Sequence, residues 1–249
     1  MIDTHCHVYK GEMNNYEEII KSCLEKGISL IINSVDINSS KDIINLSKKY
    51  KNVYASIGLN YDKIDDVTEE DLVFLEELIK LENIKAIGEI GLDYYWTKDN
   101  KEKQIEYFKK QLLLAKKYDL PVIVHARESI QDVYNIIKES GVNKGSMHCF
   151  SGSLEMAKEF IKLGFKIGVD GPITYKNNKK GVEIIKNINL RDILLETDSP
   201  YLPPEPKRGE QNTPLNLKYI TKKIAEIKNI SEVEVIEVTT NNARELFKI

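Results

Sequence analysis

The chain has 249 residues, a formal net charge of −3, 41% hydrophobic residues and 30% charged residues. This balance argues against a protein that coats duplex nucleic acid through a broad basic face, although an enzyme that grips a few phosphates remains possible. No apolar run approaches the roughly 18 residues of a membrane span, and the N-terminus does not resemble a signal peptide. The three cysteines have no C-x-x-C spacing and indicate free thiols in a reducing compartment. We therefore expect a cytoplasmic protein that has no membrane partner.

Short apolar runs alternate with longer amphipathic segments along the whole chain. In chain order, we predict strands over residues 2–5, 28–33, 53–59, 84–89, 122–125, 145–149, 165–169 and 193–196. Helical patterns lie between them, for example at 100–118, where Ile105, Phe108, Leu112 and Ala115 recur at steps of three and four residues. Further helices are predicted over 153–163, with Ser153 as N-cap, and over 215–228 and 231–247.

Eight strands that alternate with helices predict a fold of the α/β class, a (β/α)₈ TIM barrel. Because no low-complexity linker divides the chain, we expect a single domain over residues 1–249. A doubly wound open sheet is the alternative. That fold usually has a Gly-rich phosphate loop after its first strand, and this chain has His-Cys-His-Val-Tyr-Lys-Gly there.

Two of the four histidines, His5 and His7, stand one residue apart at the start of the chain. Because strand side chains alternate between faces, both are expected to point the same way, and Cys6 to point away. Two imidazoles side by side are half of a site for a metal such as Zn²⁺ or Mn²⁺. By the same alternation, we interpret Cys149, which follows His148, as a packing residue.

The other candidate ligands also stand at predicted strand ends, where a barrel builds its active site. They are Glu89, His125, His148 and Asp198, separated by one or two βα units of roughly 30 residues. Each one taken singly could be a hydrogen-bonded core residue. Four histidines and two carboxylates together exceed the needs of one tetrahedral ion. They suit two divalent ions (Mg²⁺, Mn²⁺ or Zn²⁺) that share a bridging carboxylate.

Six local motifs resemble the TatD family of metal-dependent deoxyribonucleases, which belongs to the amidohydrolase superfamily. They are Asp-Thr-His-Cys-His at 3–7, Gly-Glu-Ile-Gly-Leu-Asp-Tyr-Tyr at 88–95, Leu-Pro-Val-Ile-Val-His-Ala-Arg at 120–127, His-Cys-Phe-Ser-Gly-Ser at 148–153, Gly-Pro-Ile-Thr-Tyr-Lys-Asn at 171–177 and Leu-Glu-Thr-Asp-Ser-Pro-Tyr-Leu at 195–202. The resemblance implies one ion held by His5, His7, Glu89 and Asp198, and a second held by Glu89, His125 and His148. Glu89 would then be the bridge.

The chain departs from the family pattern at two places. Such proteins usually carry Gly-x-His-Pro-His after the third strand, and here Asn60 takes the place of the first histidine. Gln211 stands where the family tends to have arginine. We expect both positions to flank the pocket without ligating metal.

The resemblance, together with the interpretation of the six candidate ligands as a two-metal site, predicts an enzyme that hydrolyses phosphodiester bonds. Its most specific form is an enzyme that trims single-stranded DNA ends. Two ions would activate a water for attack on phosphorus. Asp198 and Glu89 are the expected catalytic carboxylates. Glu196 shares a strand face with Asp198, so it could contact either the water or a metal ligand. Apart from the DNA substrate, no obligate protein partner is evident.

Three residues near the predicted strand ends are candidate substrate contacts: Arg127, Tyr94 and Lys176. Arg127 could anchor a phosphate through its guanidinium group, or form a surface ion pair. Tyr94, with Tyr95 and Trp96, could stack on bases or pack the loop. Lys176 could lie on the rim of the site or on a solvated helix face.

Two other functions fit the same sequence features. The first is an enzyme of the amidohydrolase superfamily that acts on a small amide, ester or lactone. The second is a metal-binding protein without catalytic activity. A full ligand set at the open end of a barrel argues against the second alternative.

Overall fold

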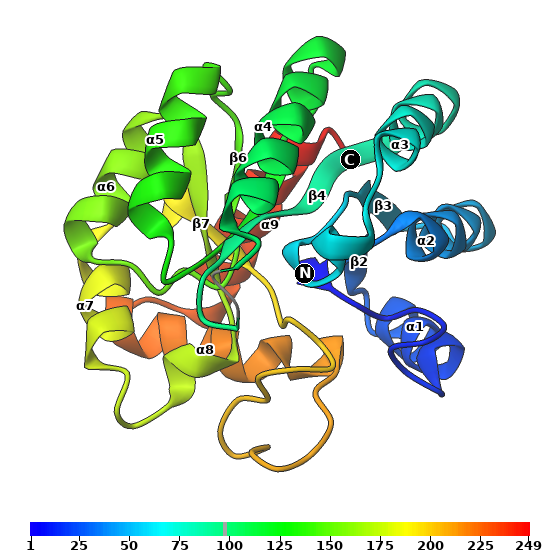
Figure 1. Ribbon diagram of the computed structural model, residues 1–249. Helices are drawn as coiled ribbons and strands as arrows, with labels where there is room; N and C mark the ends of the chain where they lie inside the picture. The colour runs from blue at the N-terminus through cyan, green and yellow to red at the C-terminus, as the bar shows by residue number, and fades with distance from the viewer. Residues whose placement is uncertain (97–98) are drawn as a thin grey trace.

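A computed structural model describes residues 1–96 and 99–249 of the chain. Its centre is one parallel sheet whose eight strands are hydrogen-bonded in chain order (Figure 1). The strands are β1 (Ile2–Cys6), β2 (Ser29–Asn33), β3 (Val53–Ile57), β4 (Ile84–Asp93), β5 (Val122–Arg127), β6 (Gly145–Met147), β7 (Phe165–Val169) and β8 (Ile193–Leu195). The predicted (β/α)₈ barrel is confirmed.

The first and last strands close the ring just beyond the end of the regular ladder. The backbone N–H of Asp198 donates to the carbonyl oxygen of His5 at 2.9 Å, and the N–H of His7 donates to that of Ser199 at 2.7 Å. Below these bonds the buried carboxylate of Asp3 accepts the hydroxyl and the N–H of Thr197, at 2.5 and 3.0 Å. The start of the chain is therefore fastened to the segment that carries Asp198.

Helices connect successive strands and surround the barrel (Figure 1). They are α1 (Tyr16–Glu25), α2 (Ile37–Lys49), α3 (Glu69–Leu81), α4 (Lys101–Tyr118), α5 (Ile130–Ser140), α6 (Leu154–Lys162), α7 (Lys179–Asn187), α8 (Leu217–Lys228) and α9 (Glu232–Phe247). The described residues also form short 3₁₀ helices, which are η1 (Tyr61–Asp66), η2 (Gly171–Thr174), η3 (Leu190–Asp192) and η4 (Pro214–Asn216). The side chain of Ser153 accepts from the N–H of Met156, which confirms the predicted N-cap of α6.

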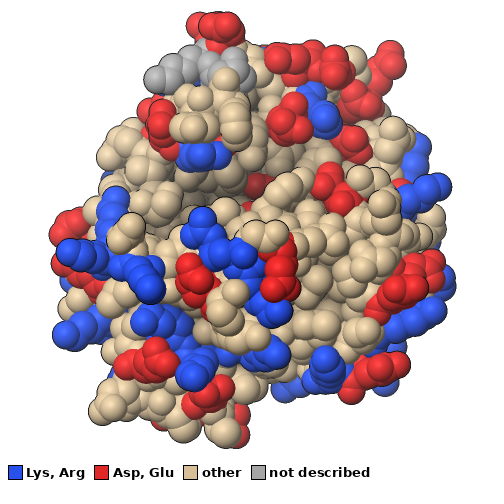
Figure 2. Space-filling view, turned by 90° about the horizontal axis from the view of Figure 1, so that it is seen from below, with Lys and Arg blue, Asp and Glu red and all other residues tan. Residues whose placement is uncertain are grey.

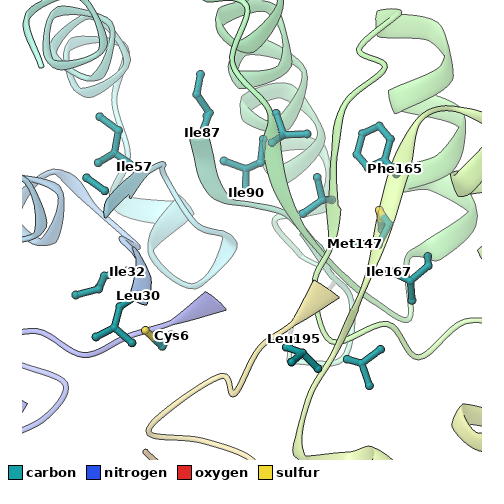
Figure 3. Packing of buried hydrophobic residues seen from close by; sticks show 14 of the residues in the cluster. Cys6, Leu30, Ile32, Ile57, Ile87, Ile90, Met147, Phe165, Ile167 and Leu195 are labelled. Carbon is teal, nitrogen blue, oxygen red and sulfur yellow. The ribbon is translucent and has the colours of Figure 1, made fainter. Parts of the chain in front are cut away.

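Strand side chains divide between two apolar clusters because they alternate between faces. One large cluster lies between the barrel and its helices; Figure 3 shows Cys6, Leu30, Ile32, Ile57, Ile87, Ile90, Met147, Phe165, Ile167 and Leu195 of it. A smaller cluster joins the intervening strand residues Ile2, Ile31, Ala86, Ile123 and Leu194 to Ala243 and Phe247 of α9. This packing leaves room for a site at the end of the barrel where the strands finish.

Several strand ends differ from the predicted ones. β4 runs on to Asp93 and β5 to Arg127, so Glu89 lies inside its strand, whereas β6 stops at Met147, before His148. Within the described part of the chain, no helix is long and apolar enough to cross a membrane.

Candidate metal centre

A cavity of about 740 Å³ opens where the barrel strands finish. Figure 2 views the molecule from this end and shows a hollow with acidic atoms in its depth. The cavity is lined by five of the predicted ligands: His7, Glu89, His125, His148 and Asp198. The sixth, His5, is fully buried, and its Nε2 lies 3.1 Å from Nε2 of His7.

The ligand atoms form three overlapping groups, each within 4.8 Å, that could each hold a metal ion. The groups are His5, His148 and Asp198; His5, His7 and Glu89; and Glu89, His125 and His148. The structure thus brings all six predicted ligands together. Asp198 lies close to two of these histidines. Its Oδ1 is 3.4 Å from Nε2 of His5 and 3.7 Å from Nε2 of His148.

His7, just past the end of β1, is oriented by the backbone of β2. Its Nδ1 lies 3.0 Å from the carbonyl oxygen of Asn33. Because a carbonyl oxygen only accepts, Nδ1 carries a hydrogen, so Nε2 holds the lone pair whenever the ring is neutral. Nε2 faces the centre, 3.4 Å from Oε2 of Glu89.

His148 is oriented by Glu196. Nδ1 of His148 lies 3.0 Å from Oε1 of Glu196, and Nε2 faces Asp198 at 3.7 Å. Glu196 is fully buried and also accepts the N–H of Cys149 at 2.6 Å. A Cβ atom at Gly168 would lie 2.4 Å from this carboxylate, so glycine leaves the room for it. Of the two expected contacts of Glu196, the water or a metal ligand, the structure shows the second, because its carboxylate lies behind the candidate ligand His148 and positions that ring.

His125 is oriented by Asp93, a residue that the sequence analysis missed. Nε2 of His125 lies 3.0 Å from Oδ2 of Asp93, and Nδ1 lies 3.1 Å from Oε1 of Glu89. Gly91 lets β4 pass this closely, because it has φ 142° and a Cβ there would lie 2.1 Å from the carbonyl oxygen of His125. One sequence signal could have identified Asp93. It follows Glu89 by an even number of residues, and such residues of one strand point to the same face.

Three of the four imidazoles therefore bind an acceptor through one ring nitrogen and turn the other toward the Glu89 carboxylate. Histidines that ligate metal ions have this arrangement, because the outer acceptor fixes the tautomer and raises the basicity of the ligating nitrogen. The fourth ring, His5, has a buried Nδ1 that finds no partner among the described residues. Imidazole nitrogens combined with carboxylate oxygens suit ions such as Zn²⁺ and Mn²⁺. The residues fit a divalent metal centre.

Glu89 stands between two pairs of histidines. Its Oε2 lies 3.7 Å from Nε2 of His5 and 3.4 Å from Nε2 of His7. Its Oε1 lies 3.1 Å from Nδ1 of His125 and 4.0 Å from Nε2 of His148. One carboxylate oxygen faces each pair, which is the arrangement that a bridging ligand needs.

The two acidic ligands are ionised at neutral pH. Burial raises the pKa of Glu89, but hydrogen bonds from His125 and His7 outweigh burial and hold it well below its usual range. Burial likewise raises the pKa of Asp198, and the charges of His148 and His5 lower it by more. Burial lowers the pKa of His148, yet Glu196 and Asp198 raise it to about 10. A cation and a proton therefore compete for His148, so that a metal ion bound there would release a proton.

Asn60 holds Glu89 in place. Its Nδ2 donates to Oε2 of Glu89 at 2.9 Å, and its Oδ1 accepts the N–H of Asp62 at 3.2 Å, at the start of η1. Because η1 uses Oδ1, the amide orientation is fixed. Asn60 therefore does more than flank the pocket, since it contacts the carboxylate expected to bridge the ions.

We expect Asn60→Ala to lower the free energy of unfolding by about 1–3 kcal/mol, because a buried carboxylate loses a donor. Urea denaturation of the metal-free protein measures this change. Asn187→Ala is the matched control, since its exposed side chain donates to one helix carbonyl; its effect should stay within about 0.5 kcal/mol. Equal effects of the two variants would contradict a special role for Asn60.

The three predicted substrate contacts have different outcomes. Arg127 lines the cavity, and its guanidinium lies over the ring of Tyr95, so its role as a phosphate anchor stays a prediction. Tyr94 is buried and donates its hydroxyl to Asp132 at 3.0 Å, so the prediction that it stacks on substrate is wrong. Lys176 is exposed but does not line the cavity.

The two cysteines beside ligands also differ from each other. Cys6 is fully buried in the outer core, as predicted. Cys149 lines the cavity, which corrects its interpretation as a packing residue. The alternation rule fails for Cys149 because β6 has ended two residues earlier, and the backbone there has φ 43°. Burial raises the pKa of the Cys149 thiol well above its usual value, so the thiol stays protonated.

Comparison with known proteins places this centre in a family. A family model described as TatD related DNase matches residues 2–248. The "Uncharacterized metal-dependent hydrolase YabD" of Bacillus subtilis is 40% identical over 253 residues, which cover 100% of this chain and 99% of that protein.

Solved structures give the same result. The crystal structure of the TatD homologue YjjV from Escherichia coli superposes with a TM-score of 0.93 at 30% identity, covering 100% of this chain and 98% of that one. A phosphotriesterase homology protein from Escherichia coli, with a TM-score of 0.70 and 12% identity over 99% of this chain and 98% of that one, shares the fold alone. On its sequence, its barrel and its cluster of potential metal ligands, the chain belongs to the TatD family.

Proposed function

We propose that this protein is a divalent-metal-dependent hydrolase of phosphodiester bonds that trims single-stranded DNA ends. The observation that carries the metal dependence is the orientation of three imidazoles, those of His7, His125 and His148, which Asn33, Asp93 and Glu196 fix so that the second nitrogen of each faces Glu89. The TatD related DNase family supports DNA as the substrate. The net charge of −3 favours local contacts with a few phosphates over a broad basic groove.

The six ligands would hold two divalent ions, with Glu89 between them. Such ions supply charge that stabilises the oxygens around phosphorus and makes water a nucleophile at neutral pH. Asp198 would accept the proton of the attacking water, because its carboxylate lines the cavity and its side chain is 13% exposed. Arg127 would bind a non-bridging phosphate oxygen through its N–H groups, since a guanidinium matches phosphate geometry.

The test is cleavage of a 5′-labelled single-stranded oligonucleotide by the purified protein. We expect release of mononucleotides with Mg²⁺ or Mn²⁺, and loss of that activity in EDTA, which removes both ions. A duplex with blunt ends and an RNA of the same sequence are the comparison substrates. No cleavage of any strand across a panel of metals would contradict the proposal.

A small amide, ester or lactone is the second candidate substrate. The observation in its favour is the cavity itself, whose volume of about 740 Å³ lies within the range of small-molecule sites. Turnover of small esters in the absence of nucleic-acid cleavage would favour this candidate.

A further inference from the structure

The aromatic side chains that the described chain exposes gather at the mouth of the cavity. Among its exposed large hydrophobic residues, three are aromatic: Tyr95, Trp96 and Tyr201, with 51%, 70% and 51% of their surfaces exposed. Trp96 and Tyr201 line the cavity. Tyr95 packs on Arg127, which lines it as well. The other described aromatic residues are buried or only partly exposed. The gathering of exposed aromatic residues at one cavity indicates a binding role.

Tyr95, Arg127 and Trp96 form one cluster, which we call the aromatic platform. The guanidinium carbon of Arg127 lies 3.8 Å from the ring centroid of Tyr95 and 5.4 Å from that of Trp96. The two rings meet edge to face, with centroids 4.9 Å apart and an angle of 84°. Arg127 lines the cavity, so the N–H groups at the edge of its guanidinium can reach a ligand there.

The platform is built onto the metal centre. Oδ1 of Asp93 accepts the N–H of Tyr95 at 2.8 Å and the N–H of Trp96 at 3.3 Å. The other oxygen, Oδ2, lies 3.0 Å from Nε2 of His125. One buried carboxylate therefore fixes both the turn that carries the aromatic rings and a ring of the candidate metal centre.

We propose that the aromatic platform binds one nucleobase of a single-stranded nucleic acid, next to the phosphate that is cleaved; this rests on the proposed function. Flat aromatic and guanidinium faces stack on any base, because every base has a π-face. The guanidinium of Arg127 can contribute to both stacking and phosphate binding. Its flat face lies on the ring of Tyr95, while the N–H groups at its edge can donate to a phosphate. A base inside a duplex is already stacked on its neighbours, so the platform favours single strands and frayed ends.

Trp96 is the one tryptophan in the sequence, so intrinsic tryptophan fluorescence reports directly on the platform. The experiment titrates the full chain in Mg²⁺ with phosphorothioate-linked tetrathymidylate, which resists cleavage. An abasic tetramer of equal length and charge is the second probe. We expect the thymidylate to quench the fluorescence of Trp96 and the abasic strand to leave it nearly unchanged. Equal responses to both probes would overturn the proposal.

Variants separate stacking from charge. Arg127→Lys keeps the charge but loses the flat face, so we expect it to weaken binding of the thymidylate by roughly tenfold. Tyr219→Leu removes a partly exposed aromatic ring from α8, away from the cavity lining. Tyr219→Leu should leave the quenching of Trp96 intact. Wild-type affinity in Arg127→Lys, or loss of quenching in Tyr219→Leu, would place the base elsewhere.

Kinetics provide a readout that distinguishes this inference from the proposed function. We expect kcat/KM to favour a base-bearing strand over an abasic one by roughly tenfold, the order of one stacked base. Trp96→Ala should abolish this ratio, and Tyr219→Leu should keep it. Cleavage with no preference for bases would overturn the platform alone. Quenching of Trp96 without any cleavage would overturn the nuclease function and leave the platform standing.

Discussion

Replacing Asp198 with asparagine is expected to lower the turnover number for DNA cleavage by about 10²–10⁴-fold, the range typical of losing a general base. The carboxylate lies 3.4 Å from His5 and 3.7 Å from His148, and these rings keep its pKa below the usual value despite burial. It is therefore ionised and able to accept a proton from water. An amide at this position keeps an oxygen of similar shape but cannot take up the proton.

The measurement is single-turnover cleavage at a metal concentration that saturates both proteins, with bound metal counted in parallel. Asp62→Asn is the matched control, because this carboxylate also lines the cavity but belongs to none of the three groups of potential ligands. We expect that control to cleave at close to the wild-type rate. An Asp198→Asn protein that cleaves as fast as the control would exclude Asp198 as the base.

The barrel and the cluster of six candidate ligands could be predicted from the sequence because both depend on local patterns. Apolar runs of strand length marked the strands, and polar residues near the ends of such runs converge in any barrel. His5 and Asp198, at opposite ends of the chain, meet because the barrel closes there, as the bond between their backbones shows.

The residues that orient the ligands could not be predicted in the same way. The partner of His7 is the backbone carbonyl of Asn33, and no residue type identifies such an acceptor in advance. Glu196 could be paired with His148 only once the end of β6 was known, because the backbone turn after Met147 points the ring at it. These are contacts between different strands, and their geometry depends on the tertiary fold.

Tyr94 shows why substrate contacts were harder to predict than ligands. It adjoins two aromatic residues that are exposed, yet its own ring is buried, with the hydroxyl on Asp132 and the Lys101 ammonium 4.5 Å from the ring centroid. Asp132 and Lys101 come from the helices α5 and α4. The sequence gives three aromatic residues in a row, and only the packing of those helices decides which of them faces the cavity.

Glu89→Ala should have the largest effect on metal content, because Glu89 presents one carboxylate oxygen to His5 and His7 and the other to His125 and His148. We expect the affinity for both ions to fall by more than the roughly 10–100-fold typical of losing an outer hydrogen-bond partner. His5→Ala and His148→Ala should each weaken mainly one ion. Glu89→Gln keeps the shape but loses the charge that offsets repulsion between two nearby cations, so it should resemble Glu89→Ala more than the wild type.

The measurement is metal stoichiometry by mass spectrometry on each purified variant at matched free metal. Asp170→Asn is the matched control, because Asp170 is a buried carboxyl of the same cavity outside the three groups of potential ligands. Burial, with the nearby charge of Glu196, raises the pKa of Asp170 to about 8, so most of this group is already neutral at pH 7. Its replacement should therefore keep both ions. A Glu89→Ala protein that also kept both ions at wild-type affinity would end the bridging model, and the paired imidazoles of His5 and His7 would then have to hold their ion with Asp198 alone.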